Sequence, residues 1–300
     1  MQSTLAYTIQ GLAHQSPVTA FCIDHQTSYV AQTVKQATVI TACHLDDSTA
    51  SASADLKTQI TLSNLVNVHS LALITSAPKL SLLLCGQPTD ASGQLNAPEL
   101  WRVSVDTATK DQQPEIFKMT HLESANITGT ALPGPVIGAV SALSSDRSEL
   151  AVMVLDRGQH LQGTVYNMAQ MNHLLWQLTA HGQTTIEAGD LKMIATVYQS
   201  FKPKVKQLAP ETIGSIQSIS FSNGRALYAT KSYGDEHAVS KGFWLLKNGF
   251  HDQPIDQLPE NTALTGISLL GKYVYFVQSQ HQANGNYLNT IQRVEKTLWK

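Results

Sequence analysis

The chain has 300 residues, of which 42% are hydrophobic and only 14% are charged, and its formal net charge at pH 7 is −2. An average globular protein has about 25% charged residues. The surface is therefore expected to be polar but nearly neutral, and bulk charge draws it toward neither nucleic acid nor an anionic membrane. No apolar run reaches the roughly 18 residues of a membrane-spanning helix, so we expect a soluble protein without a transmembrane segment.

Short β-rich runs separated by turn residues recur from the start of the chain. A single run at 5–10 comes first, followed by a unit with runs at 19–23, 28–32, 38–42 and 59–62 and a Ser/Ala/Asp-rich loop expected at 46–55. A second unit has runs at 68–74, 80–85 and 100–105. The β-branched and aromatic residues of these runs favour strands, and small sheets repeated about every 50 residues are typical of propeller blades.

The third unit is less regular than the first two. We expect it to begin near 119–124, to contain a Gly/Pro-rich stretch at 128–138, and to continue with strands at 140–143, 149–155 and 163–166. Apolar residues then recur at helical spacing, namely Met168, Met171, Leu174, Leu175 and Leu178. This spacing predicts a short helix at 169–179 packed on the side of the propeller, and the run at 191–198 is predicted to be an outer strand ahead of the fourth unit.

The fourth and fifth units are the clearest. They have strands at 215–221 and 226–230 joined by Asn223-Gly224, strands at 265–270 and 273–277 joined by Gly271-Lys272, and third runs at 242–246 and 288–294. The fifth unit lacks a fourth strand, and an open ring would leave two unpaired edges. We therefore expect the run at 5–10 to complete the last blade. The prediction is one all-β domain over 1–300, a single five-bladed β-propeller with one short peripheral helix.

The three cysteines, Cys22, Cys43 and Cys85, lie in apolar runs without a Cys-x-x-Cys spacing. This pattern indicates buried free thiols more than a disulfide framework or a zinc site. A disulfide between Cys22 and Cys43 is the alternative.

Known catalytic motifs are missing from the sequence. It contains no Gly-x-Ser-x-Gly elbow, no His-Glu-x-x-His, no Walker loop and no dinucleotide fingerprint. The stretch 44–47 has the side chains for a metal site, but a solvated turn explains it better. We predict no metal, no cofactor and no catalytic residue. Glu123 with Glu149 or Asp146 is the candidate carboxylate pair for a glycosidase, but the sequence does not give their separation.

Polar residues on the first strand of each unit are the best candidates for a binding site. In a propeller these strands line the central channel, and the residues concerned are His69, His121, Glu123, Gln217 and Thr265. His121 and Glu123 are two apart on a predicted strand and would share one face. We predict that the five bind a sugar or small polar ligand at the channel mouth. The alternative is that they bond to one another and to buried water.

Several blocks of this chain resemble the helveticin J family of large, heat-labile bacteriocins. The block Lys-Met-Thr-His-Leu-Glu-Ser at 118–124 and Val-Tyr-Asn-Met at 165–168 are similar to the family's Lys-Met-Thr-His-x-Glu and Tyr-Asn-Leu segments. Residues 214–219 resemble its Asn-Ser-Ile-Gln-Gly segment, and 287–299 its Thr-Leu-Asn-Glu-Ile…Trp terminus. The resemblance covers about the last two thirds of the chain. An insertion at 127–138 and a shortened loop at 233–237 depart from the family pattern.

The resemblance implies an antibacterial protein that is secreted and acts on related bacteria in defence, although no conventional signal peptide opens the sequence; a cytoplasmic location is the alternative. The favoured interpretation is a non-enzymatic propeller that binds a bacterial cell-surface glycan or receptor. One alternative is a cell-wall glycan hydrolase or lyase that uses carboxylates at the channel mouth. Another is a protein-interaction scaffold.

Overall fold

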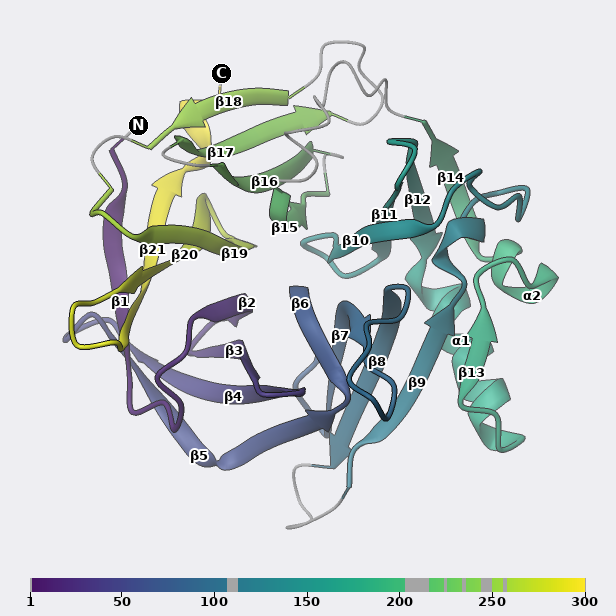
Figure 1. Ribbon diagram of the computed structural model, residues 1–300, viewed down its shortest axis with the longest axis horizontal. Coiled ribbons are helices and arrows are strands. Elements are labelled where there is room, and N and C mark those ends of the chain that lie inside the picture. The colour runs from purple at the N-terminus through teal and green to yellow at the C-terminus, as the bar shows by residue number, and fades with distance from the viewer. Residues whose placement is uncertain are drawn as a thin grey trace.

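The computed structural model describes residues 2–106, 113–202, 216–223, 226–233, 236–243, 250–255 and 258–299. Within this part of the chain the strands form four sheets, and Figure 1 shows them arranged around a central axis. One sheet has eight strands and comprises two blades joined edge to edge. The fold is therefore the predicted five-bladed β-propeller, with β2, β6, β10, β15 and β19 as the innermost strands.

The strands of the five blades have the following bounds. Blade 1 comprises β2 (Val18–Asp24), β3 (Thr27–Val34), β4 (Ala37–Asp46) and β5 (Ser51–Ser63). Blade 2 comprises β6 (Leu65–Thr75), β7 (Lys79–Pro88), β8 (Glu99–Asp106) and β9 (Glu115–Thr120), with β13 (Thr185–Glu187) added in parallel at its outer edge. Blade 3 comprises β10 (Val136–Leu143), β11 (Glu149–Asp156), β12 (Leu161–Asn167) and β14 (Val197–Phe201). Blade 4 comprises β15 (Ile216–Phe221), β16 (Ala226–Tyr233), β17 (Glu236–Phe243) and β18 (Phe250–Pro254). Blade 5 comprises β19 (Thr262–Leu270), β20 (Tyr273–His281), β21 (Tyr287–Glu295) and β1 (Thr4–Gln10).

The first strand, β1, closes the ring. It pairs antiparallel with β21, from Thr4 opposite Arg293 to Thr8 opposite Thr290. Its end also pairs in parallel with the start of β5, where Gln10 lies opposite Ser53. The prediction that the N-terminal strand completes the last blade is confirmed, and the same strand also joins blade 5 to blade 1.

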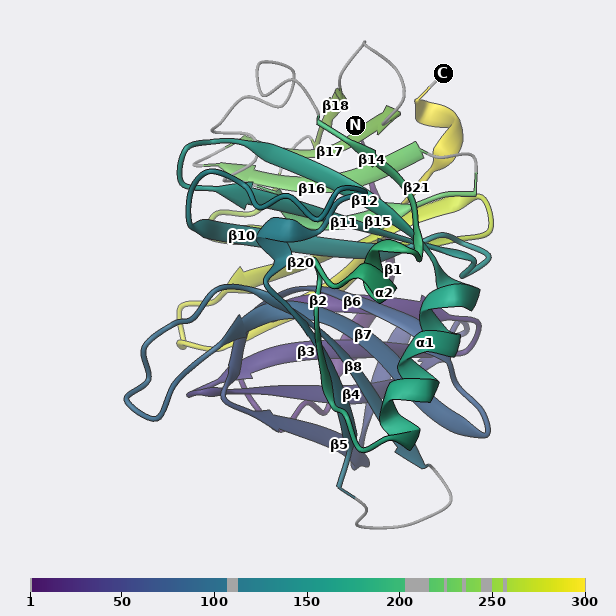
Figure 2. The ribbon, with the colours of Figure 1, turned by 90° about the vertical axis from the view of Figure 1, so that its right-hand side faces the viewer.

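The peripheral helix is α1 (Met168–Ala180), close to the predicted range. The Asn167 side chain caps it by accepting a hydrogen bond from the backbone N–H of Gln170. Its five predicted apolar residues are buried and belong to one hydrophobic cluster with side chains of blades 2 and 3. Figure 2 shows the helix lying along the outside of the ring. No helix in the described ranges is long and apolar enough to cross a membrane.

The third unit differs from the prediction. Met119 lies in β9, the fourth strand of blade 2, and residues 122–124 form a 3₁₀ helix. The backbone at His121 is left-handed, with φ of 52°, which ends the strand. The first strand of blade 3 is therefore β10, after the Gly/Pro-rich stretch. The unit was placed too early because the fourth strand of blade 2 was read as the first strand of blade 3.

Other boundaries also differ. The predicted outer strand at 191–198 is the short helix α2 (Leu191–Ile194), capped by Asp190, followed by β14. The predicted loop at 46–55 is shorter, because residues from Ser51 onward pair with β4 and β1. Of the predicted strand at 242–246, the first two residues end β17 and the rest lie outside the described residues.

All three cysteines are free and buried, as predicted. Burial raises the pKa of each thiol to about 12. These groups are inert components of the core at neutral pH.

Candidate functional site

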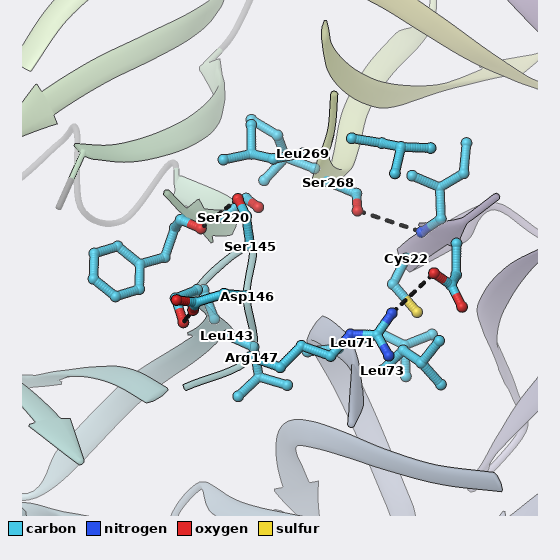
Figure 3. Close-up of a pocket in the computed structure, with 18 of the residues that line it drawn as sticks. Cys22, Leu71, Leu73, Leu143, Ser145, Asp146, Arg147, Ser220, Ser268 and Leu269 are labelled. Carbon is cyan, nitrogen blue, oxygen red and sulfur yellow. Dashed lines mark hydrogen bonds and ion pairs between the residues drawn. The ribbon is translucent and has the colours of Figure 1, made fainter. Parts of the chain in front are cut away.

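A cavity of about 680 Å³ opens at the end of the channel where the innermost strands of all five blades finish; we call it the central cavity (Figure 3). It is lined by residues at the ends of β2, β6, β10, β15 and β19 and by the turns that follow them, namely Cys22–His25, Leu71–Leu73, Ser76, Ala142–Arg147, Ile219–Phe221 and Ile267–Leu270. Its volume lies in the range of about 300 to 1,000 Å³ that is usual for small-molecule sites.

Tight turns place polar residues at the rim of the central cavity. His25 has a φ of 50° in the turn between β2 and β3, and Arg147 has a φ of 62° in the turn between β10 and β11. In the second turn the Arg147 N–H donates to the Ser144 carbonyl oxygen at 2.8 Å. Aliphatic residues near the ends of the inner strands, such as Leu71, Leu73 and Ile267, also line the cavity, so its lining combines apolar and polar side chains.

Arg147 lies across the cavity between blades 3 and 1. Its Nη2 donates to Asp24 Oδ1 at 2.9 Å (Figure 3). Its Nη1 donates to the carbonyl oxygen of Ile74 at 3.4 Å. The Asp24 side chain is only 17% exposed and that of Arg147 36% exposed. Because the pair is partly shielded from water, this charge-assisted bond holds its geometry better than a fully exposed pair would.

Asp146 is the second carboxylate of the central cavity. Its Oδ1 accepts hydrogen bonds from Ser144 Oγ at 2.6 Å, from Ser148 Oγ at 2.8 Å and from the Ser148 N–H at 3.1 Å. The bond from Ser144, followed by those from Ser148, lowers the pKa of the Asp146 carboxyl. The Asp146 N–H donates to Asn223 Oδ1 at 2.8 Å, which ties this turn to blade 4. Asp146 is therefore an ionised carboxylate held in one orientation at the rim.

The remaining polar groups of the rim are hydroxyls. Ser145, Ser220 and Ser268 line the cavity (Figure 3). Ser268 Oγ accepts the N–H of Ile23 at 3.3 Å, so blades 5 and 1 are also bonded here. Cys22 lies at the same end of the channel, but burial raises its pKa to about 12, and the thiol is a poor nucleophile.

The predicted site residues do not gather at this cavity. His69 and Thr265 do lie on innermost strands, β6 and β19. His69 is half-buried, and burial lowers its pKa. Thr265 is buried and donates to the Val18 carbonyl oxygen at 2.6 Å. Neither side chain lines the central cavity.

His121 and Glu123 were placed wrongly. They lie in the connection between β9 and β10, not on an innermost strand, and they do not share a strand face. His121 is exposed, and its Nδ1 lies 3.9 Å from Glu187 Oε1 at the outer edge of blade 2. Gln217 has its backbone in β15, but its side chain lies outside the described residues. Ligand binding by the five predicted residues stays a prediction.

The sequence contained a partial indication of the observed site. Asp146 was one of the carboxylates considered for a glycosidase, whereas Asp24 and Arg147 were missed. Asp24 ends an innermost strand at the polar turn Asp-His-Gln, and Arg147 follows another in the polar turn Ser-Ser-Asp-Arg. A charged residue in the turn after a first strand was the sequence signal that could have indicated the site. Within the described residues, no group of three or more His, Cys, Asp or Glu side chains is arranged to hold a metal ion.

Comparison with known proteins gives both a family and a fold. The family model described as bacteriocin helveticin-J matches residues 1–251. No curated protein matches the chain. Among solved structures, a GH43 β-1,3-galactosidase aligns with a TM-score of 0.53 at 8% identity, over 99% of this chain and 64% of that one.

Two further structures align over most of both chains. A GH43_1 enzyme from Xanthomonas citri has a TM-score of 0.47 at 9% identity, with 98% of this chain and 90% of that chain covered. An α-L-arabinanase from Penicillium chrysogenum has a TM-score of 0.42 at 10% identity, with 98% and 76% covered. At such identities the likeness concerns the fold.

These comparisons correct the function expected from the sequence. The favoured interpretation was a non-enzymatic propeller that only binds a surface component. The GH43 β-1,3-galactosidase that shares the fold of this chain is a glycoside hydrolase, and this finding favours the alternative, a glycan hydrolase, over the non-enzymatic interpretation.

Proposed function

Because the chain belongs to the helveticin J family of bacteriocins, we propose that it is a secreted antibacterial enzyme that hydrolyses a glycan of the bacterial cell envelope. The reaction class is that of the GH43 β-1,3-galactosidase whose fold it shares. A shared fold does not assign a reaction by itself. The observation that carries the proposal is that two carboxylates, Asp24 and Asp146, line one cavity of ligand size.

Glycoside hydrolysis commonly needs two carboxyl groups with different tasks. One protonates the oxygen of the leaving sugar, and the other acts as a nucleophile or activates a water molecule. Asp146 suits the second task, because its hydrogen bonds from Ser144 and Ser148 lower its pKa and keep it ionised. Asp24 is the other carboxyl group of the cavity. Arg147 Nη2 donates to its Oδ1 at 2.9 Å and so fixes its orientation at the rim.

The rest of the central cavity supports a carbohydrate ligand. Sugars present many hydroxyl groups around a less polar ring face, and the serine hydroxyls of the rim can donate to and accept from these groups. The aliphatic side chains of the lining match the less polar face. Arg147 adds a planar donor group between blades 1 and 3.

The test is hydrolysis of purified bacterial cell walls by the full-length protein, measured as newly released reducing ends. We expect Asp146→Asn and Asp24→Asn each to lower the rate by about 100-fold or more, the usual scale for loss of an acid–base group. Asp90→Asn is the matched control. Asp90 also accepts bonds from a serine two residues on, Ser92 N–H at 2.8 Å and Ser92 Oγ at 2.6 Å, but it does not line the cavity.

The control separates chemistry from folding. Asp90→Asn removes a negative charge from the same kind of turn and should leave the rate unchanged. The proposal fails if wild-type protein releases no more reducing ends than heated protein, or if Asp146→Asn is as active as wild type. Growth inhibition of related bacteria by the same set of variants then tests whether hydrolysis causes the antibacterial effect.

A further inference from the structure

A second cavity lies beside the central one on the same end of blade 1. It has a volume of about 290 Å³ and is lined by Tyr7, His25, Gln26, His44, Leu45, Asp46, Asp47 and Ser48; we call it the side cavity. Its walls are the turn between β2 and β3, the end of β4 with the turn after it, and one side chain of β1. His25 lines both cavities, so the two adjoin at this residue.

The walls of the side cavity are held together by long-range bonds. Tyr7 Oη donates to Asp47 Oδ1 at 2.5 Å, between residues 40 apart in the sequence. Burial and the Asp47 carboxylate raise the pKa of Tyr7, so its phenol keeps the proton it donates. The Leu45 N–H donates to the Gln26 carbonyl oxygen at 2.8 Å. The cavity is therefore formed in advance of any ligand, which lowers the entropic cost of binding.

The groups left at the surface of the side cavity are hydrogen-bonding ones. Gln26 and His44 have exposed side chains, as does His25 at the junction. Asp46 is kept ionised, since bonds from Ser48 Oγ at 2.7 Å and the Ser48 N–H at 2.9 Å lower its pKa. An amide, two imidazoles and carboxylates together can bond the hydroxyl groups of a sugar from several directions.

We infer that the side cavity is a distal sugar subsite, so that the enzyme takes a polymeric glycan which runs from the central cavity past His25 into the side cavity. This inference rests on the proposed function, because it extends the same binding site. The two cavities open at one end of the propeller and share a residue. A chain that leaves the central cavity past His25 meets hydrogen-bonding groups already held in place.

The test compares short and long substrates with a variant confined to the side cavity. The double variant Gln26→Ala/His44→Ala removes two exposed side chains that do not line the central cavity. The substrates are soluble peptidoglycan fragments, disaccharides and longer oligosaccharides. The KM of the variant for the longer fragments should rise about tenfold with kcat unchanged, as expected for one or two lost hydrogen bonds. Its KM for disaccharides should not change.

A matched control is the double variant Gln183→Ala/His181→Ala, which removes the same two side-chain types from exposed positions after α1. It should behave as wild type on both substrates. The distal subsite is wrong if the side-cavity variant cleaves the longer fragments with the wild-type KM, or if its KM rises equally for both substrate lengths. Either result leaves the proposed hydrolase function intact. If wild-type protein cleaves neither substrate, the proposed function fails, and the subsite fails with it.

Discussion

The junction between blades 5 and 1 and the junction between blades 2 and 3 are held in different ways. At the first, β1 forms backbone ladders with both β21 and β5, so one sheet continues from blade to blade. At the second, the described strands form separate sheets. Side chains of both blades meet there in one cluster with α1. The junction that closes the ring depends on backbone hydrogen bonds made by the N-terminal strand. The junction of blades 2 and 3 depends on the packing of apolar side chains.

The largest expected effect comes from removing the closing strand. Deletion of residues 1–10 loses the ladders to β21 and β5 and the burial of Ala6, Tyr7 and Ile9. Each ladder hydrogen bond is worth about 1 kcal/mol net, and each large apolar side chain about 1.5 to 3 kcal/mol. Folded domains have only about 5 to 15 kcal/mol of stability. We expect the deletion to abolish the cooperative thermal unfolding transition, which can be measured by circular dichroism.

Deletion of residues 1–3 alone is the control, since it ends just before β1 and should leave the melting curve unchanged. This pair of deletions also tests the proposal that the chain is a single cooperative domain. If the 1–10 deletion variant melts within a few degrees of wild type, the pairing of β1 with blades 5 and 1 is not needed for a stable fold.

A smaller effect is expected at the junction of blades 2 and 3. Met171 on α1 is 2% exposed and belongs to the cluster between these blades. Met171→Ala should lower the free energy of unfolding by about 2 to 5 kcal/mol, because it leaves a cavity in packed side chains. The unfolding transition in denaturant should stay cooperative. Gln170→Ala, one position earlier and exposed, should change stability by less than about 0.5 kcal/mol.

Equal losses from the two α1 substitutions would contradict the role assigned to the apolar cluster. Loss of cooperativity in Met171→Ala would erase the distinction between the two junctions, because packing would then also control closure.

The smallest effect concerns His69 on the innermost strand of blade 2. Burial lowers its pKa below the ordinary value of 6.5, so the folded state binds this proton less readily than the unfolded state. The contribution of His69 to the free energy of unfolding is therefore fully present above about pH 6.5. It is lost as the pH falls below that value toward the folded-state pKa. The melting temperature of His69→Gln should fall less than that of wild type over this window.

His44→Gln, which changes an exposed imidazole, should keep the wild-type pH profile. Parallel profiles for His69→Gln and wild type would show that His69 does not contribute to the acid sensitivity of the fold.

Much of the fold could be predicted from local patterns. Turn residues such as Gly271-Lys272 between two β-rich runs predicted the hairpin β19–β20, and the spacing from Met168 to Leu178 predicted α1. The third blade was misplaced because a left-handed residue, His121, ends β9. Strand propensity does not say to which blade a strand belongs, since neighbouring blades use the same residue types.

The site was harder to predict than the fold. Asp24 and Arg147 lie 123 residues apart and meet at 2.9 Å only because β2 and β10 end at the same mouth of the channel. The predicted residues are polar residues of the expected first strands, whereas the cavity is lined by the last residues of the innermost strands and by the turns that follow them.

The sequence by itself determined the strands, the helix and the need for a closing strand, because these follow from side-chain periodicity, turn chemistry and the cost of unpaired edges. Only the tertiary structure decided which carboxylates share a cavity. The position of a side chain around the ring depends on how each blade twists and packs against the next. That packing is determined by many weak contacts between residues far apart in the chain.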